Sequence, residues 1–561
     1  MNLILKNAAR WVWKWRWVFL MNVFLISPVF AYEFRLGEGG PDKTIIFTLS
    51  ASVLWLLAAQ LLARRILIAH ALMFPLYVTV AIDLYVIAHY QTRLASNMIL
   101  SIVENIGDAP GFVQTDFAPV AGGFLLLLAG YGYALWQTRN LRVTVPRLAV
   151  LAPLFALGFV YLGVHRYVDT WGVVLLKDRN SPFGIVSQAV LSLSLHRQEL
   201  VGRERAKSFR FDASRPDEPE EPELYVLVVG ESARRHNWSL YGYARETNPR
   251  LSRISNLIVF KDVISQVAQT QVSVPLILTR GTIEDLHRTV SEKSIVSLFH
   301  EVGFHTGWIS TQERETAMAA ISRFSSEADA VRFFDHRHDI VVVDTLKEML
   351  ANPGAQGTKV FIMAHTLGSH FNLTSRYPPK FAVFPDGRGS SLIPGASAWV
   401  SHTELINAYD NTILYTDYVL AELIELLRDR PGIKALLYVP DHGDNLRDDT
   451  RDLFGHAHSN EYDLPIPMLF WYSDEYARRY PDKVANARKN SSRPLSTRAV
   501  FYSLTDMAGI KLDDSELPRL SVFSCKLENV RRMVFGQQGP FDFDEWTNRT
   551  GTKIPIVEPP K

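Results

Sequence analysis

Acidic and imidazole side chains in this sequence stand where short apolar runs end. Glu231 follows the run LYVLVV at 224–229, and the run ALLYV at 435–439 leads into PDHGD, which holds Asp441 and His442. A carboxylate at the end of a buried run is costly unless it is paired or binds a cation. Oxygen and nitrogen donors without thiolate suit Zn²⁺, or a similar divalent ion such as Mn²⁺. The pattern predicts a metal site, although a helix N-cap explains Gly-Glu-Ser equally well.

Four further histidines lie close to apolar runs. His365 and His370 lie in AHTLGSH, and His456 and His458 lie in FGHAHSNEYDLPIP ahead of the run MLFWY. Imidazole is a ligand for zinc and a partner for the oxygens of a transferring phosphoryl group. A His-x-His pair in a loop is also a common surface arrangement, so spacing alone leaves both interpretations open.

Thr270 stands on a polar turn in ISQVAQTQVSVP, residues 264–275. A threonine hydroxyl that faces a cation can attack phosphorus, but it is hardly ionised at neutral pH and needs activation by a metal or a neighbouring base. Spacing by itself does not separate Thr270 from the other threonines. Together with the acids and histidines, Thr270 suggests metal-assisted displacement at phosphorus.

Apolar runs alternate with helical stretches over the C-terminal part of the chain. This alternation predicts an α/β domain whose mostly parallel sheet is covered by helices on both faces. Ligands bind at the carboxyl ends of parallel strands, so the acids and histidines are expected at that edge. The expected strands are 224–229, 257–260, 306–309, 359–364, 435–439 and 468–472, and the expected helices are 296–303, 340–351, 406–428 and 496–508.

The N-terminal third contains five apolar segments that are long enough to cross a bilayer. Basic residues precede the first segment and fill the loops between the second and third and between the fourth and fifth. The positive-inside rule therefore predicts a cytoplasmic N-terminus and places everything after His165 on the far side. Asp83, inside the third segment, is either functional or close to the interface. The expected five transmembrane helices are 17–33, 45–63, 66–89, 117–136 and 147–164.

The loop at 91–115, between the third and fourth segments, has an amphipathic pattern. Such a pattern suits a helix that lies on the outer membrane surface. Ser101, Glu104 and Asn105 fall on its more polar side. A structural cap without a binding role is the alternative.

Composition limits the domains and the partners. Residues 212–223, DASRPDEPEEPE, are rich in proline and acid and mark a boundary. The expected division is a transmembrane domain at 1–166, bridging helices and linker at 167–223, and a soluble domain at 224–561. The net charge of +1 gives no basic field for nucleic acid. Cys525 is the only cysteine, which excludes a disulfide or a cysteine metal site within one chain.

Five motifs together resemble the membrane-bound phosphoethanolamine transferases of Gram-negative bacteria, the lipid A / lipopolysaccharide core type within the alkaline phosphatase–sulfatase superfamily. The resemblance covers nearly the whole chain, because five spans followed by a periplasmic catalytic domain is the layout of that family. It implies an alkaline-phosphatase-like fold for the soluble domain. The motifs are GESARRHNWSLYGYARETNP (230–249), TQVSVP (270–275), HTLGSH (365–370), INAYDNTILYTDYV (406–419) and DHG (441–443).

The resemblance implies a role for each matching position. Thr270 matches the nucleophile, which is also a zinc ligand. His370 matches a histidine that binds the phosphoryl group or a second zinc, and His456, or else His458, matches another. Ser101 and Asn105, with Glu104 as their neighbour, fall where the family contacts the phosphoethanolamine head group. The implied zinc ligands are Glu231, Thr270, Asp441 and His442.

The implied reaction transfers phosphoethanolamine from phosphatidylethanolamine to lipid A, lipopolysaccharide core or another periplasmic glycan through a phosphothreonine. The implied location is the bacterial inner membrane, with the catalytic domain in the periplasm. A phosphoglycerol transferase of the same fold is the nearest rival. A phosphatase or sulfatase and an inactive membrane scaffold are the others, but sulfatases use a modified cysteine or serine where this chain has Thr270.

The chain departs from many relatives in one respect. Those relatives have a disulfide that flanks the nucleophile loop, whereas the matching positions here are Gln266 and Leu276. Packing must therefore hold the loop that carries Thr270.

Overall fold

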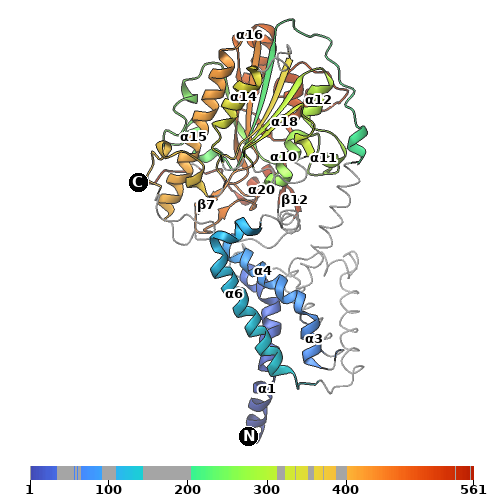
Figure 1. Ribbon diagram of the computed structural model, residues 1–561, viewed down its shortest axis with the longest axis vertical. Coiled ribbons are helices and arrows are strands. Elements are labelled where there is room, and N and C mark those ends of the chain that lie inside the picture. Colours follow the sequence, from blue (N-terminus) through green and yellow to red (C-terminus); the bar gives the residue numbers. More distant parts are fainter. Residues whose placement is uncertain are drawn as a thin grey trace. The chain divides into compact units, whose positions relative to one another are not determined.

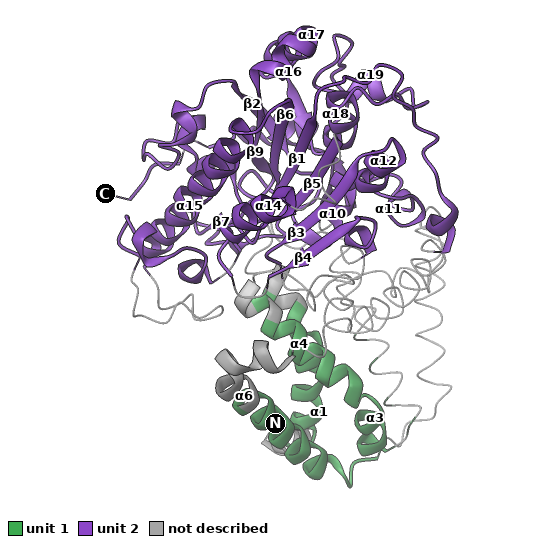
Figure 2. Ribbon diagram, turned by 45° about the horizontal axis from the view of Figure 1, so that its top comes forward, with its two compact units in different colours: residues 1–197 green, residues 198–561 purple. Residues whose placement is uncertain are grey.

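The computed structural model divides the chain into two compact units, Met1–Arg197 and Gln198–Lys561 (Figure 2). Each unit is considered by itself. The described residues are 2–33, 53, 56, 60, 63, 65–90, 109–142, 204–312, 323–334, 337–351, 359–370, 372–386, 401–536, 539–555 and 557–560.

The second unit is built on a central sheet (Figure 1). This sheet has eight strands in the order β10-β2-β9-β6-β1-β5-β3-β4. All neighbours pair in parallel except β9, which is antiparallel to both β6 and β2. The predicted mostly parallel sheet is therefore confirmed. The strands are β1 (Glu223–Gly230), β2 (Leu257–Ile264), β3 (His305–Ser310), β4 (Ala330–Phe333), β5 (Lys359–His365), β6 (Ile433–Pro440), β9 (Pro465–Tyr472) and β10 (Pro494–Ser496).

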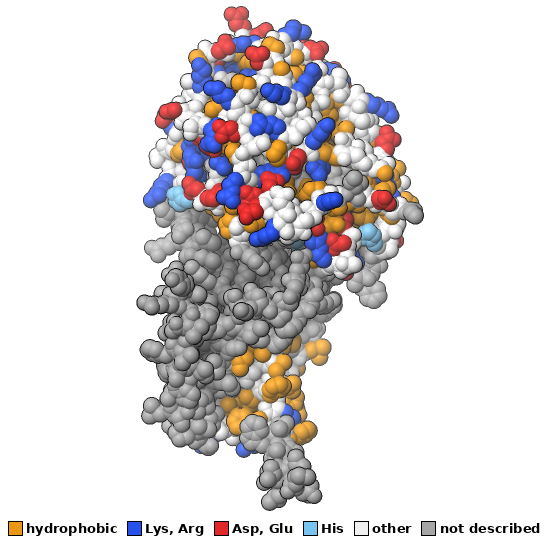
Figure 3. Space-filling view, turned by 180° about the vertical axis from the view of Figure 1, so that it is seen from behind, with side chains coloured by type: hydrophobic (Ala, Val, Ile, Leu, Met, Phe, Trp, Pro, Cys, Tyr) orange, Lys and Arg blue, Asp and Glu red, His pale blue; other side chains and the backbone are white. Residues whose placement is uncertain are grey.

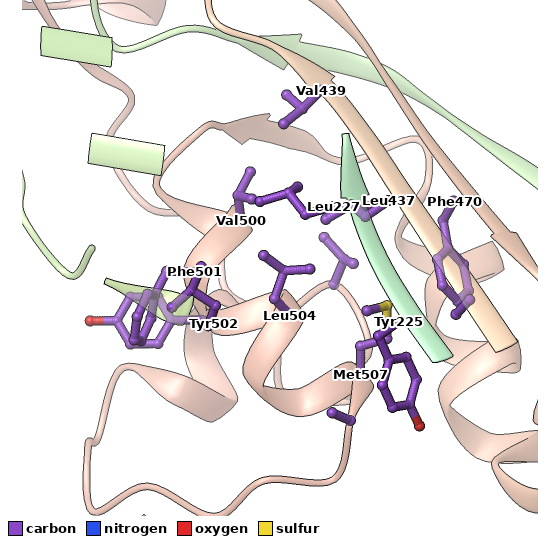
Figure 4. Close-up of a cluster of buried hydrophobic side chains, with 14 of the residues drawn as sticks. Tyr225, Leu227, Leu437, Val439, Phe470, Val500, Phe501, Tyr502, Leu504 and Met507 are labelled. Carbon is purple, nitrogen blue, oxygen red and sulfur yellow. The ribbon is translucent and has the colours of Figure 1, made fainter. Parts of the chain in front are cut away.

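Strand β1 is apolar throughout because both of its faces are covered. Tyr225, Leu227 and Val229 pack into one hydrophobic cluster, and the alternate residues Leu224, Val226 and Val228 pack into the other. Figure 4 shows the first cluster, in which strand residues meet residues 500–507. Strand β1 is thus fixed on both faces, and so is the position of its carboxyl end.

Helices cover the two faces of the sheet as the sequence predicts. The first cluster includes residues of α10, α12 and α18, and the second includes residues of α14 and α15. Helix α15 begins with a capping box between Ser401 and Glu404, which satisfies two backbone donors at its start. The bounds are α10 (Thr270–Leu278), α11 (Arg288–Ser291), α12 (Ile295–Glu301), α14 (Val341–Ala351), α15 (His402–Arg428), α16 (Asp474–Arg479), α17 (Pro481–Asn490), α18 (Ala499–Met507) and α19 (Leu517–Leu520).

Short elements complete the second unit. Near the C-terminus, β11 (Met533–Gly536) and β12 (Gly539–Asp542) form an antiparallel hairpin that leads into α20 (Phe543–Thr550). The remaining elements are β7 (Asn445–Leu446), β8 (Phe454–Gly455) and the 3-10 turns η2 (Arg235–Asn237), η3 (Ser239–Tyr241), η4 (Leu251–Arg253), η6 (Leu373–Ser375) and η7 (Pro379–Phe381).

The first unit contains four described helices: α1 (Asn2–Glu33), α3 (Ile66–Leu72), α4 (Phe74–Tyr90) and α6 (Ala109–Thr138). Helices α1, α4 and α6 share a small apolar cluster that includes Met21, Tyr77 and Ala134. Large apolar side chains such as Leu72 and Leu126 are exposed, and Figure 3 shows apolar side chains gathered on the described part of this unit.

Three of the five predicted spans fall on described helices. Segment 17–33 lies in α1, 66–89 covers α3 and α4 with a break at Met73, and 117–136 lies in α6. Within the described residues, no single helix meets the length and hydropathy of a span; Ile66–Leu72 and Phe74–Tyr85, at 55° to one another, meet them as a bent pair. Segment 147–164 and most of 45–63 lie outside the described residues. The five-helix transmembrane domain stays a prediction, and so do the domain limits.

Ser101, Glu104 and Asn105 lie outside the described residues. Asp83 is 1% exposed within α4.

Candidate active site

The carboxyl ends of β1 and β6 bring Glu231 and Asp441 together. In the parallel register of these strands Gly230 lies opposite Pro440, so the next residue of each strand enters the same space. The Asp441 N–H donates to the Gly230 carbonyl at 3.0 Å, which continues the pairing by one step. The expected convergence at this edge of the sheet follows directly from the strand register.

Glu231, Asp441 and His442 form a compact donor set. One ligand atom of each residue lies within 4.8 Å of the others. His442 Nε2 lies 3.3 Å from Asp441 Oδ2 and 3.7 Å from Glu231 Oε1. All three side chains are buried, and Asp441 Oδ2 has no hydrogen-bond partner among the described residues. Two carboxylate oxygens, one of them buried and unsatisfied, and one imidazole nitrogen fit a divalent cation such as Zn²⁺.

The electrostatics of the donor set point the same way. Burial and the neighbouring Asp441 charge raise the pKa of Glu231 well above its ordinary value, and burial raises the pKa of Asp441. Burial also lowers the pKa of His442 to about 4, so this imidazole is neutral at pH 7. Two adjacent buried carboxylates repel one another, and a bound cation removes that repulsion.

Thr270 is the first residue of α10, and its side chain joins the donor set. Thr270 Oγ1 lies 3.2 Å from both Glu231 Oε1 and Oε2 and 3.2 Å from His442 Nε2. Thr270 is half-buried, unlike the three donors, so its hydroxyl can meet a substrate. The start of a helix also favours negative charge, because its N–H groups and dipole point outward.

The backbone of Asp441 is held by two serines. Ser265 Oγ and Ser273 Oγ donate to the Asp441 carbonyl at 2.5 and 2.6 Å. Ser273 lies one turn after Thr270, so the helix of the threonine is tied directly to the loop of the acid. The N–H groups of Ser232 and His442 donate to Asp441 Oδ1 at 3.0 and 2.7 Å, which leaves Oδ2 for a cation.

The tautomer of His442 follows from its second ring nitrogen. Nδ1 lies 2.9 Å from the Gly443 carbonyl, so Nδ1 carries the proton and Nε2 keeps its lone pair. That lone pair faces Thr270 and the two carboxylates.

A fully buried arginine joins the loops that follow β1 and β6. The Arg234 guanidinium forms two hydrogen bonds with Asp448, at 2.6 and 2.9 Å, and a third with Asn237. A Cβ added at Gly443 would lie 2.6 Å from Arg234 Cβ, so glycine is needed for this close approach. Ser232, between the donor residue and the arginine, has a φ of 53°, a strained value for a residue with a side chain.

The structure separates the two candidate histidines of the 456–458 loop. The His456 ring lies 4.4 Å from the His442 ring, and its Nδ1 contacts the Ala268 carbonyl at 3.1 Å. His458 Nε2 contacts the Phe454 carbonyl at 3.1 Å instead. The αL conformation of Ala457, with a φ of 73°, sets the two rings apart. His456 is therefore the one beside the donor set.

His370 shares the electrostatic environment of these rings. Burial lowers its pKa well below the ordinary value, and Arg376, His456 and His442 lower it further. Burial lowers the pKa of His456 to about 3, with His442 as a second cause. Both imidazoles are therefore neutral at pH 7 when no ligand is bound.

Two more residues lie at the site: Gln312, which has no predicted role, and His365, one of the four candidate histidines. Gln312 Nε2 donates to Glu231 Oε2 at 3.1 Å and to the Thr366 carbonyl at 3.2 Å. His365, the last residue of β5, is fully buried, and neither ring nitrogen has a hydrogen-bond partner among the described residues. Both follow apolar runs, so the strand-end criterion points to them, but glutamine is neither a titratable nor a common metal-binding residue.

Comparisons with known proteins agree with this site. The family model described as Sulfatase matches residues 223–510, just over half of the chain. Phosphoethanolamine transferase EptC of Escherichia coli strain K12 is 29% identical over 329 residues, which cover 56% of this chain and 55% of EptC. Kdo(2)-lipid A phosphoethanolamine 7''-transferase of the same strain is 28% identical over 270 residues, 45% of this chain and 44% of that protein. The chain thus matches about half the length of these curated relatives.

Two solved structures are also similar. The periplasmic domain of Escherichia coli EptC in complex with Zn gives a TM-score of 0.53 at 27% identity, over 61% of this chain and 98% of that domain. The integral membrane protein EptA of Neisseria meningitidis gives a TM-score of 0.65 at 18% identity, over 89% of this chain and 95% of EptA, which shows a shared fold. The resemblance to phosphoethanolamine transferases is confirmed by these relatives, and the match over 223–510 shows that the chain belongs to the sulfatase family.

Proposed function

We propose that this protein transfers phosphoethanolamine from phosphatidylethanolamine to lipid A or lipopolysaccharide core through a covalent intermediate on Thr270. The observation that carries the proposal is the position of Thr270 Oγ1, 3.2 Å from Glu231 and from His442 Nε2 at the edge of the donor set. The names of the relatives support the transferred group.

Glu231, Asp441 and His442, with Thr270, would hold a zinc ion. A bound zinc ion would lower the pKa of the threonine hydroxyl. The hydroxyl already points at Glu231, whose carboxylate accepts its proton as the bond to phosphorus forms. The bond from phosphorus to the diacylglycerol oxygen breaks in the same displacement. That oxygen takes a proton from water, and Glu231 releases to water the proton that it accepted.

The second half of the reaction reverses this exchange. An acceptor oxygen of the glycolipid loses its proton and bonds to phosphorus, and the threonine oxygen leaves and regains its proton. The start of α10 favours the negative charge on the phosphoryl oxygens. Neutral His370 and His456 are proposed to bind the phosphoryl group or a second zinc, with His456 favoured over His458 because its ring lies 4.4 Å from His442.

The proposed location is the inner membrane, with a cytoplasmic N-terminus and a periplasmic catalytic domain at 224–561. The exposed apolar side chains of the first unit support contact with lipid. Ser101, Glu104 and Asn105, in the segment between the third and fourth proposed spans, are proposed to contact the donor head group.

Mass spectrometry of Thr270 tests the proposal. The purified full chain is mixed with phosphatidylethanolamine in the absence of acceptor, and the peptide that contains residue 270 is analysed. We expect one phosphoethanolamine on wild-type Thr270 and none in Thr270→Ala, whereas Thr270→Ser, which keeps a hydroxyl, retains part of the modification. A phosphoglycerol adduct would identify the rival transferase, and an unmodified peptide with release of free phosphoethanolamine would identify a hydrolase.

A further inference from the structure

The C-terminal hairpin β11–β12 contacts both loops that carry half-buried residues of the site. The Phe535 N–H donates to the Gln266 carbonyl at 2.9 Å, four residues before Thr270. The Phe535 carbonyl accepts from Ser459 Oγ at 3.0 Å, three residues after His456. The residues at 265–270, which lead to Thr270, are called the nucleophile loop, and those at 456–459 the histidine loop. The backbone of a single residue thus joins these two loops.

The two loops also bind each other. The Ala268 carbonyl accepts from the Ala457 N–H at 3.0 Å and lies 3.1 Å from His456 Nδ1. Ala268 is two residues before the nucleophile, so a shift of either loop changes the separation of Thr270 and His456. Phe535 completes this arrangement, because its backbone is hydrogen-bonded to both loops.

Apolar packing fixes the hairpin on the nucleophile loop. Val534 is fully buried in a cluster with Ile264 and Ala268. Met533 packs against another small apolar cluster, which contains Val267 and Leu276. The Phe535 side chain is 39% exposed, so its two backbone hydrogen bonds, rather than its ring, join the loops.

The hairpin is anchored to the rest of the unit by its own contacts. Arg532 forms ion pairs with Asp544 and with Asp262 of β2, the latter at 2.7 Å. The Phe543 N–H donates to the Arg532 carbonyl at 3.0 Å, which ties the start of α20 to the start of the hairpin. The hairpin is therefore a fixed support and not a tail that follows the loops.

We propose that the β11–β12 hairpin positions Thr270 and His456 for the transfer reaction, through the backbone of Phe535. This inference rests on the proposed function. Because Cys525 is the only cysteine, a disulfide within the chain cannot hold the nucleophile loop, and the hairpin takes that task. Phe535 and Ser459 are positioning residues, since they act through the loops and do not touch the reacting atoms.

Phe535→Pro tests the inference by removing one N–H group. That N–H points away from β12, where the opposite residue is Pro540, so the hairpin pairing keeps its hydrogen bonds. We expect kcat for Thr270-dependent transfer by the full chain to fall about 10- to 100-fold, because small misplacements of a nucleophile are costly. KM for phosphatidylethanolamine and the zinc content per chain stay within about twofold of wild type. The matched control Phe535→Ala keeps both backbone groups and retains wild-type kcat.

Ser459→Gly tests the other link. Ser459 has a φ of 56°, which glycine adopts freely, so the substitution removes the hydroxyl without backbone strain. We expect a smaller fall in kcat, and no further fall when Ser459→Gly is added to Phe535→Pro, because both act on one junction. Hydrogen exchange of the amides at 266–272 and 456–459 rises in both variants while the sheet stays protected.

The outcomes separate the inference from the proposed function. Wild-type kcat in both variants overturns the inference. A fall in kcat with equal loss of zinc and of protection across the sheet also overturns it, because the hairpin then only stabilises the fold. If the wild-type chain shows no Thr270-dependent transfer, the proposed function fails, and the exchange rates at 266–272 and 456–459 still decide whether the hairpin holds the two loops.

Discussion

At the carboxyl ends of the central strands β1 and β6, two carboxylates lie side by side, close to an imidazole nitrogen and a threonine hydroxyl. Burial and mutual repulsion make Glu231 and Asp441 unfavourable neighbours when both are ionised. The fold nevertheless holds Asp441 in place through backbone N–H groups and two serines, and it holds Glu231 through Ser232 Oγ and Gln312 Nε2. Stability is thus given up locally for a donor set that fits a cation.

Zinc should stabilise the folded chain through this donor set. At a zinc concentration 100 times its Kd, the gain in the free energy of unfolding is about 2.7 kcal/mol. We expect His442→Ala to abolish this gain, whereas His287→Ala, which removes an exposed imidazole, keeps it. Thermal unfolding with and without zinc, after removal of metal by a chelator, measures both. An undiminished gain in His442→Ala would contradict the assigned donor set.

Gln312 should tune the metal and the nucleophile without binding either directly. Its amide holds Glu231 Oε2 at 3.1 Å, and loss of such an outer partner typically costs about 10- to 100-fold in metal affinity or activity. We expect Gln312→Ala to lower zinc affinity within that range. Gln312→Glu should be worse, because it replaces a donor with a like charge beside Glu231. Zinc titration of the three proteins measures the order, and equal affinities would refute the role.

The sequence identifies the reactive residues better than the residues that hold them. Glu231, Asp441 and His442 are marked by chemical type at the end of an apolar run. Ser265, Ser273 and Gln312 have no such mark, because serine and glutamine are common in loops and their contacts depend on three-dimensional proximity. His456 and His458 are equivalent in sequence, and the αL conformation at Ala457 is what distinguishes them.

Helix α15 holds the segment at 237–251, which follows β1, through two of its carboxylates. Its Asp417 is buried and accepts from the N–H groups of Arg250 and Leu251, at 3.0 and 2.9 Å. Asp410, two turns earlier, accepts from Asn237 and Arg245 at 2.6 Å each. Much of the motif at 230–249, with its neighbours at 250–251, thus binds this helix. Only the beginning of the motif, at Glu231, enters the site.

The stability of this contact should depend on pH. Burial raises the pKa of Asp417 to about 6, so the folded chain keeps a proton that the unfolded chain releases near pH 4. The stabilisation is complete below about pH 4 and is lost as the pH rises to about 6, roughly 3 kcal/mol by linkage. We expect the free energy of unfolding of wild type to fall relative to that of Asp417→Asn as the pH rises over that interval. Denaturant unfolding of both proteins at several pH values measures this change. A wild type that gains stability relative to Asp417→Asn as the pH rises would contradict the assignment.

Strand prediction succeeds in the interior of the sheet and fails at its two edge strands. The six runs that lie in the covered part of the sheet are apolar enough to be recognised. The edge strands β4 and β10 have only four and three residues and include polar positions, so they resemble loops. The antiparallel direction of β9 is not encoded in the run MLFWY, because a strand covered on both faces looks the same in either direction.

At the scale of the whole molecule, the acidic segment 212–223 is held at both ends within the second unit. Ser214 exchanges hydrogen bonds with Lys511, and Arg215 forms a fully buried ion pair with Glu223 at 2.5 Å. Tyr225 and Tyr480 also contact this pair. Composition indicates a boundary here, but Phe211, just before this segment, already packs in the first hydrophobic cluster.

Removal of that arginine should be strongly destabilising. Arg215→Ala leaves the Glu223 carboxylate buried without its partner, which typically costs about 3–5 kcal/mol. The matched control Arg479→Ala breaks a solvent-exposed pair with Asp217 in the same segment and should leave the unfolding midpoint nearly unchanged. Chemical denaturation of the full chain compares them. Equal midpoints for Arg215→Ala and wild type would contradict the structural role of the buried pair.

In the first unit, the length of an apolar segment does not show whether the segment is one helix or two. Apolar length predicts α1 and α6, but Met73 divides the third predicted segment into two helices at 55°. Pro75, in the first turn of α4, is a local signal for this break, because it has no N–H to donate to the preceding turn.

The scattered origin of the donor atoms has a consequence for biogenesis. Thr270 and His442 are 172 residues apart, and they meet only after β1 and β6 have paired. A nascent or partly folded chain therefore presents no high-affinity pocket that could capture the wrong ion early. Metal uptake should be a late event in maturation, and in a refolding experiment zinc capture should lag behind formation of the central strands.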